Sequence, residues 1–160
     1  MNKPLYNFKI YFSYGQFIVY DISVSLPACD WSAEHTNQGF ARQESNASFR
    51  TIENFGQANV SVYLNEFILK EEFQRVISVP FYSSTGKIKV EGPEEFTNSI
   101  VIIQPGPYKL YAAQWVINEE NENIELFFQK LEIPATKSEI IKADEEIKPP
   151  AELLEYAESA

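Results

Sequence analysis

The sequence predicts an all-β protein, an antiparallel β-sandwich of about nine strands with a short helix after the second strand and a partly helical C-terminal tail. Three observations lead to this prediction. Apolar and polar residues alternate with a period of two through most of residues 1–133, as in half-buried strands. Turn-forming residues separate the alternating segments at short intervals, which is typical of sandwiches and barrels. A chain of 160 residues that is 44% hydrophobic and 14% aromatic can bury one sizeable core.

The first two strands are expected on either side of a tight turn. Residues 8–14 alternate between apolar and polar side chains. Gly15 and Gln16 fit a two-residue hairpin turn with glycine in the first central position, and the chain is expected to return along residues 17–24. Pro80 has no N–H group, so its strand is expected at an edge or a bulge. The remaining strands are expected at residues 58–65, 77–81, 87–91, 100–103, 108–117 and 124–133.

One short helix is expected between the second and third of these strands. Asp30 or Ser32 can cap its N-terminus, because both side chains accept hydrogen bonds from the first free N–H groups of a helix. Gly39 can end it, because glycine adopts the left-handed conformation common at helix C-termini.

The end of the chain differs in character. Pro134 ends the strand pattern, and residues 134–160 carry seven acidic residues and three lysines. Their apolar residues recur at helical spacing on both sides of Pro149 and Pro150. We therefore expect a β-sandwich domain at residues 1–133 and an acidic, partly helical tail at residues 134–160.

The charge balance restricts the partners. The chain has 13 Lys and Arg against 23 Asp and Glu, a formal net charge of −10. Phosphate-rich partners require the opposite sign, so direct nucleic-acid binding and membrane insertion are not expected, and a basic protein is the better candidate. One Cys and one His argue against a disulfide framework and against a zinc site, and no cofactor is expected. No targeting segment is recognisable, so a cytoplasmic location is expected.

The sequence gives no support to an enzyme. His35 with Asp30 and Ser32 has the composition of a catalytic triad, but no motif positions a nucleophile there. A histidine at the surface or at a helix end is the simpler interpretation. Phosphate-binding loops and metalloprotease motifs are also missing from the chain.

One segment concentrates negative charge. Residues 118–125 hold four carboxylates and no basic residue, and they fall between two expected strands, which predicts a hairpin loop. All four side chains are expected to point to solvent, because unpaired charges are costly to bury. The loop is then either an ordinary solvated loop or an anionic projection that docks in a basic cleft as a DNA mimic. For comparison, duplex DNA presents about one negative charge per 1.7 Å of its helix axis. The residues concerned are Glu119, Glu120, Glu122 and Glu125.

Trp31 allows two interpretations. Beside Asp30 it can be an exposed anchor, since tryptophan is enriched at binding hot spots. A core tryptophan that covers one end of the sandwich is the alternative.

Several short strings occur together in a recognisable order. They are Ser13-Tyr14-Gly15-Gln16-Phe17-Ile18-Val19-Tyr20, Asp30-Trp31, Gly39-Phe40-Ala41, Ala47-Ser48-Phe49, Val79-Pro80-Phe81, Pro105-Gly106-Pro107-Tyr108-Lys109-Leu110 and Trp115. In this order and spacing the chain resembles the competence protein J (ComJ) family over roughly residues 8–133. The tail has no counterpart in this resemblance.

The resemblance implies a protein that binds and blocks a nuclease of the DNA-entry type, without catalysis and without a cofactor. We therefore expect residues 1–133 to form an immunity-type inhibitor domain that presents acidic residues to the basic cleft of a DNA-entry or toxin-like nuclease. A carbohydrate-type, non-catalytic binding module is the alternative, and an enzyme ranks last. The expected partner-binding residues are Asp30 and Trp31, which belong to a matched string, and Glu119, Glu120, Glu122 and Glu125, which are chosen on electrostatic grounds.

Overall fold

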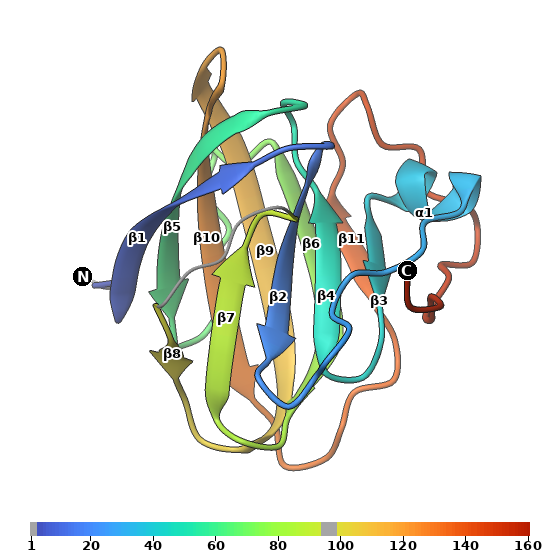
Figure 1. Ribbon diagram of the computed structural model, residues 1–160. Coiled ribbons are helices and arrows are strands. Elements are labelled where there is room, and N and C mark those ends of the chain that lie inside the picture. The colour runs from blue at the N-terminus through green and yellow to red at the C-terminus, as the bar shows by residue number, and fades with distance from the viewer. Residues whose placement is uncertain (1–2, 94–98) are drawn as a thin grey trace.

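The computed structural model describes residues 3–93 and 99–160, and in this part the chain forms two β-sheets and one helix (Figure 1). The all-β prediction is confirmed. The described elements are β1 (Tyr6–Phe12), β2 (Gln16–Asp21), α1 (Ala33–Gln38), β3 (Phe40–Arg42), β4 (Asn46–Arg50), β5 (Gly56–Tyr63), β6 (Arg75–Ser83), β7 (Lys87–Glu91), β8 (Val101–Ile102), β9 (Gly106–Asn118), β10 (Asn121–Lys130) and β11 (Glu139–Lys142).

The strands form a six-stranded sheet in the order β1-β5-β10-β9-β6-β11 and a five-stranded sheet in the order β3-β4-β2-β7-β8. Among the described pairs, β5 and β10 run parallel and the other pairs run antiparallel, so the expected antiparallel arrangement fails at one pair. The expected number of about nine strands is also wrong, because eleven are described. The expected strand ranges have no counterpart of β3, β4 or β11.

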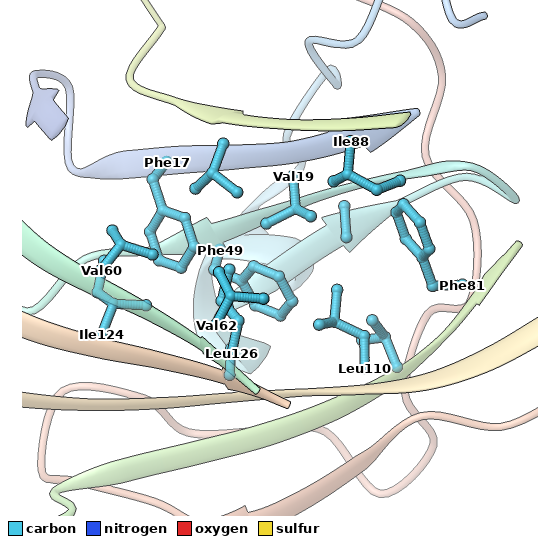
Figure 2. Close-up of a cluster of buried hydrophobic side chains, with 14 of the residues drawn as sticks. Phe17, Val19, Phe49, Val60, Val62, Phe81, Ile88, Leu110, Ile124 and Leu126 are labelled. Carbon is cyan, nitrogen blue, oxygen red and sulfur yellow. The ribbon is translucent and has the colours of Figure 1, made fainter. Parts of the chain in front are cut away.

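The core lies between the two sheets, where side chains from both inner faces interlock (Figure 2). The alternating positions predicted to be apolar supply it. A fully buried aliphatic or aromatic side chain contributes roughly 1.5–3 kcal/mol relative to an exposed one. Core residues labelled in Figure 2 are Phe17, Val19, Phe49, Val60, Val62, Phe81, Ile88, Leu110, Ile124 and Leu126.

The turn between β1 and β2 differs from the prediction. Its central residues are Tyr14 and Gly15, both with positive φ (58° and 64°), and it is closed by a bridge between Ser13 and Gln16. Beyond that bridge the strands separate, because β1 pairs with β5 in one sheet and β2 pairs with β4 and β7 in the other. The turn is therefore a corner that links the two sheets.

The predicted helix is confirmed. The Ser32 side chain accepts a hydrogen bond from the backbone N–H of His35, and Gly39 ends the helix in the left-handed conformation (φ 90°). Ser32 is thus the capping residue, whereas Asp30 contributes its backbone N–H to the carbonyl oxygen of Glu158. Within residues 3–93 and 99–160, no helix has the length and apolar character of a membrane span.

The expected helical tail is wrong. Residues 134–160, all described, contain no helix; β11 extends the six-stranded sheet beside β6, and the last residues lie against α1 and β3 (Figure 1). Ala157 donates its backbone N–H to Arg42, and Ala160 donates to Ala28. Short helices are marginal without packing, whereas the edges of β6 and β3 offer unpaired backbone groups, which explains the extended conformation.

Candidate partner-binding site

Asp30 and Trp31 lie between β2 and α1. Asp30 is exposed, and Trp31 is half-buried against Cys29, Ala41 and Ala157. The indole Nε1 donates a hydrogen bond to Oε1 of Gln16, 3.2 Å away. Trp31 therefore covers a small apolar cluster with one side and leaves part of its surface in solvent, which combines features of the two interpretations of this residue.

The acidic segment does not form the expected long loop. β9 continues to Asn118 and β10 starts at Asn121, so only Glu119 and Glu120 form the turn. Both side chains are exposed, and Glu120 has a positive φ of 68°. The carbonyl oxygen of Glu120 accepts a hydrogen bond from the N–H of Gln57 at 2.9 Å. The turn therefore presents two adjacent carboxylates at a fixed position.

The expectation of solvent exposure is wrong for Glu122, which is 1% exposed in β10. Its Oε1 accepts a hydrogen bond from the backbone N–H of Glu53 at 2.6 Å, and its Oε2 has no hydrogen-bond partner among the described residues. Burial raises the pKa of this carboxyl to about 7, although the Glu53 hydrogen bond and the charge of Arg75 act in the opposite direction.

Around Glu122 lies a buried polar cluster that sequence reasoning did not anticipate. Arg75 is fully buried and holds both carboxylate oxygens of Asp144 at 2.9 and 2.8 Å through Nε and Nη2. Its Nη1 and the Nε2 of Gln114 both donate to the carbonyl oxygen of Arg50, at 2.7 and 3.0 Å. Here the name polar cluster refers to Arg75, Gln114, Glu122 and Asp144.

The same expectation is wrong for Glu125, which is 8% exposed in β10. Its Oε1 lies 3.3 Å from Nζ of Lys70. Burial raises the pKa of Glu125, and the Lys70 charge partly offsets this effect. Glu122 and Glu125 fail the expectation because they belong to a strand of a packed sheet and not to a loop.

The residues that remain exposed gather at one end of the sandwich. The β1–β2 turn, the β4–β5 loop and the β9–β10 turn all lie at the upper end in Figure 1. The N–H of Gly15 donates to the carbonyl oxygen of Asn54 at 2.8 Å, which joins the first two segments, and the Gln57–Glu120 bond joins the second to the third. We call this region the end surface; its exposed or half-buried side chains include Tyr11, Tyr14, Trp31, Phe55, Glu119 and Glu120.

Two neighbouring hollows shape the end surface. One, of about 350 Å³, is lined by Tyr14, Gly15, Gln16, Trp31, Thr36, Arg50 and Asn54. The other, of about 370 Å³, is lined by Tyr11, Phe12, Phe55, Gly56, Gln57, Glu120 and Asn121. The structure thus brings Trp31 and the Glu119–Glu120 turn to the same end of the molecule.

Three aromatic residues of the end surface escaped sequence reasoning. Tyr14 is 75% exposed, Tyr11 63% and Phe55 58%. Tyr14 was expected on the apolar face of its strand, but it lies in the turn itself. The available signal was its position, and that of Phe55, directly before a glycine, where the backbone turns and side chains project outward.

The residues considered for catalysis have structural roles. Nδ1 of His35 accepts a hydrogen bond from the backbone N–H of Ser32 at 3.0 Å, which leaves Nε2 to donate to the carbonyl oxygen of Tyr156, also at 3.0 Å. His35 is therefore a helix-capping residue that also binds the tail. In the described ranges, no group of His, Cys, Asp and Glu is arranged to hold a metal ion.

The sequence matches the model of the competence protein J (ComJ) family over residues 9–133. Among solved structures, the chain is similar to ComJ from Bacillus subtilis, an inhibitor of the DNA degrading activity of NucA, with 20% sequence identity, a TM-score of 0.69, and coverage of 82% of this chain and 99% of that chain. It is also similar to the structure named Crocagin biosynthetic gene J, with 10% identity, a TM-score of 0.49, and coverage of 76% and 94%. No curated protein matches the sequence.

Proposed function

The chain belongs to the competence protein J (ComJ) family, and we propose that it binds a DNA-degrading nuclease and blocks its activity. The family predicted from the ordered motifs is thereby confirmed. The observation that carries the proposal is the family match over residues 9–133, together with the likeness to a ComJ described as an inhibitor of NucA. The role is stoichiometric binding, and no catalytic step is assigned to this chain.

The Glu119–Glu120 turn supports a mechanism for the inhibition. A nuclease must hold a polyanion, so the face that binds DNA carries Lys and Arg. Glu119 and Glu120 are adjacent, exposed and at the tip of a hairpin, in a chain with a net charge of −10. Inserted in the basic cleft, they replace the phosphates and exclude DNA. Opposite charges of this kind mainly accelerate association and make it sensitive to salt.

A DNA-degradation assay tests the function. The protein is titrated into a DNA-entry-type nuclease from the same source, at several salt concentrations. We expect complete inhibition at a fixed stoichiometric ratio, with the concentration needed for half-inhibition increasing with salt. Undiminished degradation in the presence of excess protein contradicts the proposal.

The mechanism has its own test. Replacing Glu119 and Glu120 by Gln keeps the size of both side chains and removes two charges. We expect the association rate to fall by about 3- to 10-fold at low ionic strength, with a shallower salt dependence. The matched control replaces two exposed carboxylates by Gln, Glu44 in the β3–β4 turn and Glu132 shortly after the end of β10. Both segments lie at the lower end in Figure 1, opposite the end surface. Equal effects in the two double variants would indicate that only net charge matters.

A further inference from the structure

The exposed aromatic residues of the protein are unevenly distributed. In the described residues, five Tyr and Phe side chains are exposed, and the two outside the end surface are Tyr82 and Tyr156. The other three, Tyr11, Tyr14 and Phe55, lie on neighbouring segments of one surface. Large aromatic rings contribute more to a protein interface than almost any other side chain, and a group of them in solvent marks an interaction site.

The β1–β2 turn, the β4–β5 loop and the β9–β10 turn, which together carry Tyr14, Phe55 and the two glutamates, are held in one arrangement. Besides the Gly15–Asn54 bond, the N–H of Thr51 donates to the carbonyl oxygen of Gly15 at 2.8 Å. Gly56, with a φ of 144°, packs so closely against the carbonyl oxygen of Glu120 that any side chain at this position would collide with it. A surface fixed in advance loses little conformational entropy on binding, so its contacts contribute more fully to affinity.

Aromatic rings and a carboxylate occur together in one of the two hollows of this surface. Tyr11, Phe55 and Glu120 line the same hollow. Tyr14 and Trp31 line the adjacent one together with Arg50, whose guanidinium is paired with the carboxylate of Glu146 at 3.5 Å. A ring face attracts a cation by about 0.5–1 kcal/mol in water and by about 2 kcal/mol when water is excluded. A carboxylate beside the ring strengthens the preference for Lys and Arg. The carboxylates repel a polyanion, which argues against nucleic acid as the occupant.

Resting on the proposed function, we infer that Tyr11, Tyr14 and Phe55 are the side chains that hold the nuclease, by packing against Lys and Arg side chains of its DNA-binding face. Glu119 and Glu120 then set the rate of association, and the three rings set the lifetime of the complex. The occupant is a basic protein surface.

Single alanine variants test this assignment. Tyr11→Ala, Tyr14→Ala and Phe55→Ala are compared with Tyr156→Ala and Ile133→Ala, which remove exposed side chains located elsewhere. The dissociation constant and the dissociation rate for the nuclease are measured, and the thermal unfolding of each free variant confirms that it is folded. We expect each of the three variants to increase the dissociation constant at least ~10-fold, mainly through faster dissociation, with an unchanged salt dependence. The two controls are expected to remain within about 2-fold of the parent protein.

The outcomes separate the inference from the function. If the parent protein inhibits and the three variants bind as tightly as the controls, the assignment of the rings is wrong and the function stands. If the parent protein does not inhibit, the proposed function is wrong. Binding of a neutral oligosaccharide such as cellohexaose, lost in the same three variants, would overturn the basic protein surface as the occupant.

Discussion

The β9–β10 hairpin contains two pairs of glutamates in opposite environments. Glu119 and Glu120 form the turn and are exposed, whereas Glu122 and Glu125 lie in β10 and are 1% and 8% exposed. In the sequence the four carboxylates look alike. The difference shows that the position relative to the turn, and not the local density of charge, decides which of them a partner can reach.

The buried pair differs from the exposed pair because β10 is an interior strand. It lies between β9 and β5, and both of its faces are covered, since Ile124 on one face and Phe127 on the other are buried in two different clusters. Glu122 also lies beneath the β4–β5 loop, which supplies the N–H of Glu53. A carboxylate in such a place acts on stability and its pH dependence, whereas one in the turn acts on recognition. The predictions below test this division.

The largest effect is expected at Arg75, the cation of the polar cluster. Replacing Arg75 by Met leaves the carboxylate of Asp144 without its two charged hydrogen bonds and removes positive charge near Glu122. Removing one partner of a buried ion pair costs about 3–5 kcal/mol. We expect a loss of this size in the free energy of unfolding, measured with urea at pH 7.

The control for this variant is Lys87→Met, which removes an exposed cation from β7 and is expected to change stability by less than about 0.5 kcal/mol. Arg75→Met combined with Asp144→Leu is expected to recover part of the loss, because no carboxylate then remains unpaired at that site. A change below about 1 kcal/mol in Arg75→Met would mean that the polar cluster is not a determinant of stability.

The next effect concerns pH and Glu122. Its pKa is about 7 in the folded protein against an ordinary value of 4.5, so between these values the folded state holds a proton that the unfolded state has lost. The resulting stabilisation is complete below about pH 4.5 and is lost as the pH rises through about 7. A shift of this size corresponds to about 2–4 kcal/mol. Glu122→Gln is expected to remove this part of the pH dependence.

The measurement is the free energy of unfolding from pH 4 to pH 8, taken as the difference between Glu122→Gln and the parent protein. That difference isolates Glu122 from other groups such as Glu125, whose pKa is raised by burial in the same direction. As the pH rises from 4 to 8, the free energy of unfolding of Glu122→Gln is expected to increase relative to that of the parent protein. A difference that is constant across this range would show that Glu122 has an ordinary pKa in the folded protein.

The two environments also show how much could be predicted from the sequence. The alternation of apolar residues predicted most strands, and Ser32 and Gly39 predicted the helix, because these signals are local. β4 was missed although its polar and apolar residues alternate, because the strand has only five residues and only two of them, Ala47 and Phe49, are apolar. The burial of Glu122 depends on Glu53, which is 69 positions away, and no local signal carries that information.

The candidate site was predicted in the same uneven way. A motif led to Trp31 and charge density led to Glu119 and Glu120, which the fold brings to one end. Tyr14 was missed because the period-two pattern places it on the apolar face of residues 8–14, and Phe55 was missed because it lies outside the expected strands. The tail was expected to be helical, but the free edges of β6 and β3 decide its conformation, and their position follows from the topology.

The smallest effect on stability is expected at the exposed pair. Glu119→Gln with Glu120→Gln removes two charges from a turn whose side chains contact mainly water, so the free energy of unfolding should change by less than about 0.5 kcal/mol between pH 5 and pH 8. The urea series described for Arg75 provides the measurement. A loss above about 1 kcal/mol would give the turn a structural role, and slower nuclease binding by this variant would then no longer be evidence for direct contact. If stability is unchanged while association slows, the two carboxylates act on the partner and the separation of the hairpin into a recognition pair and a stability pair holds.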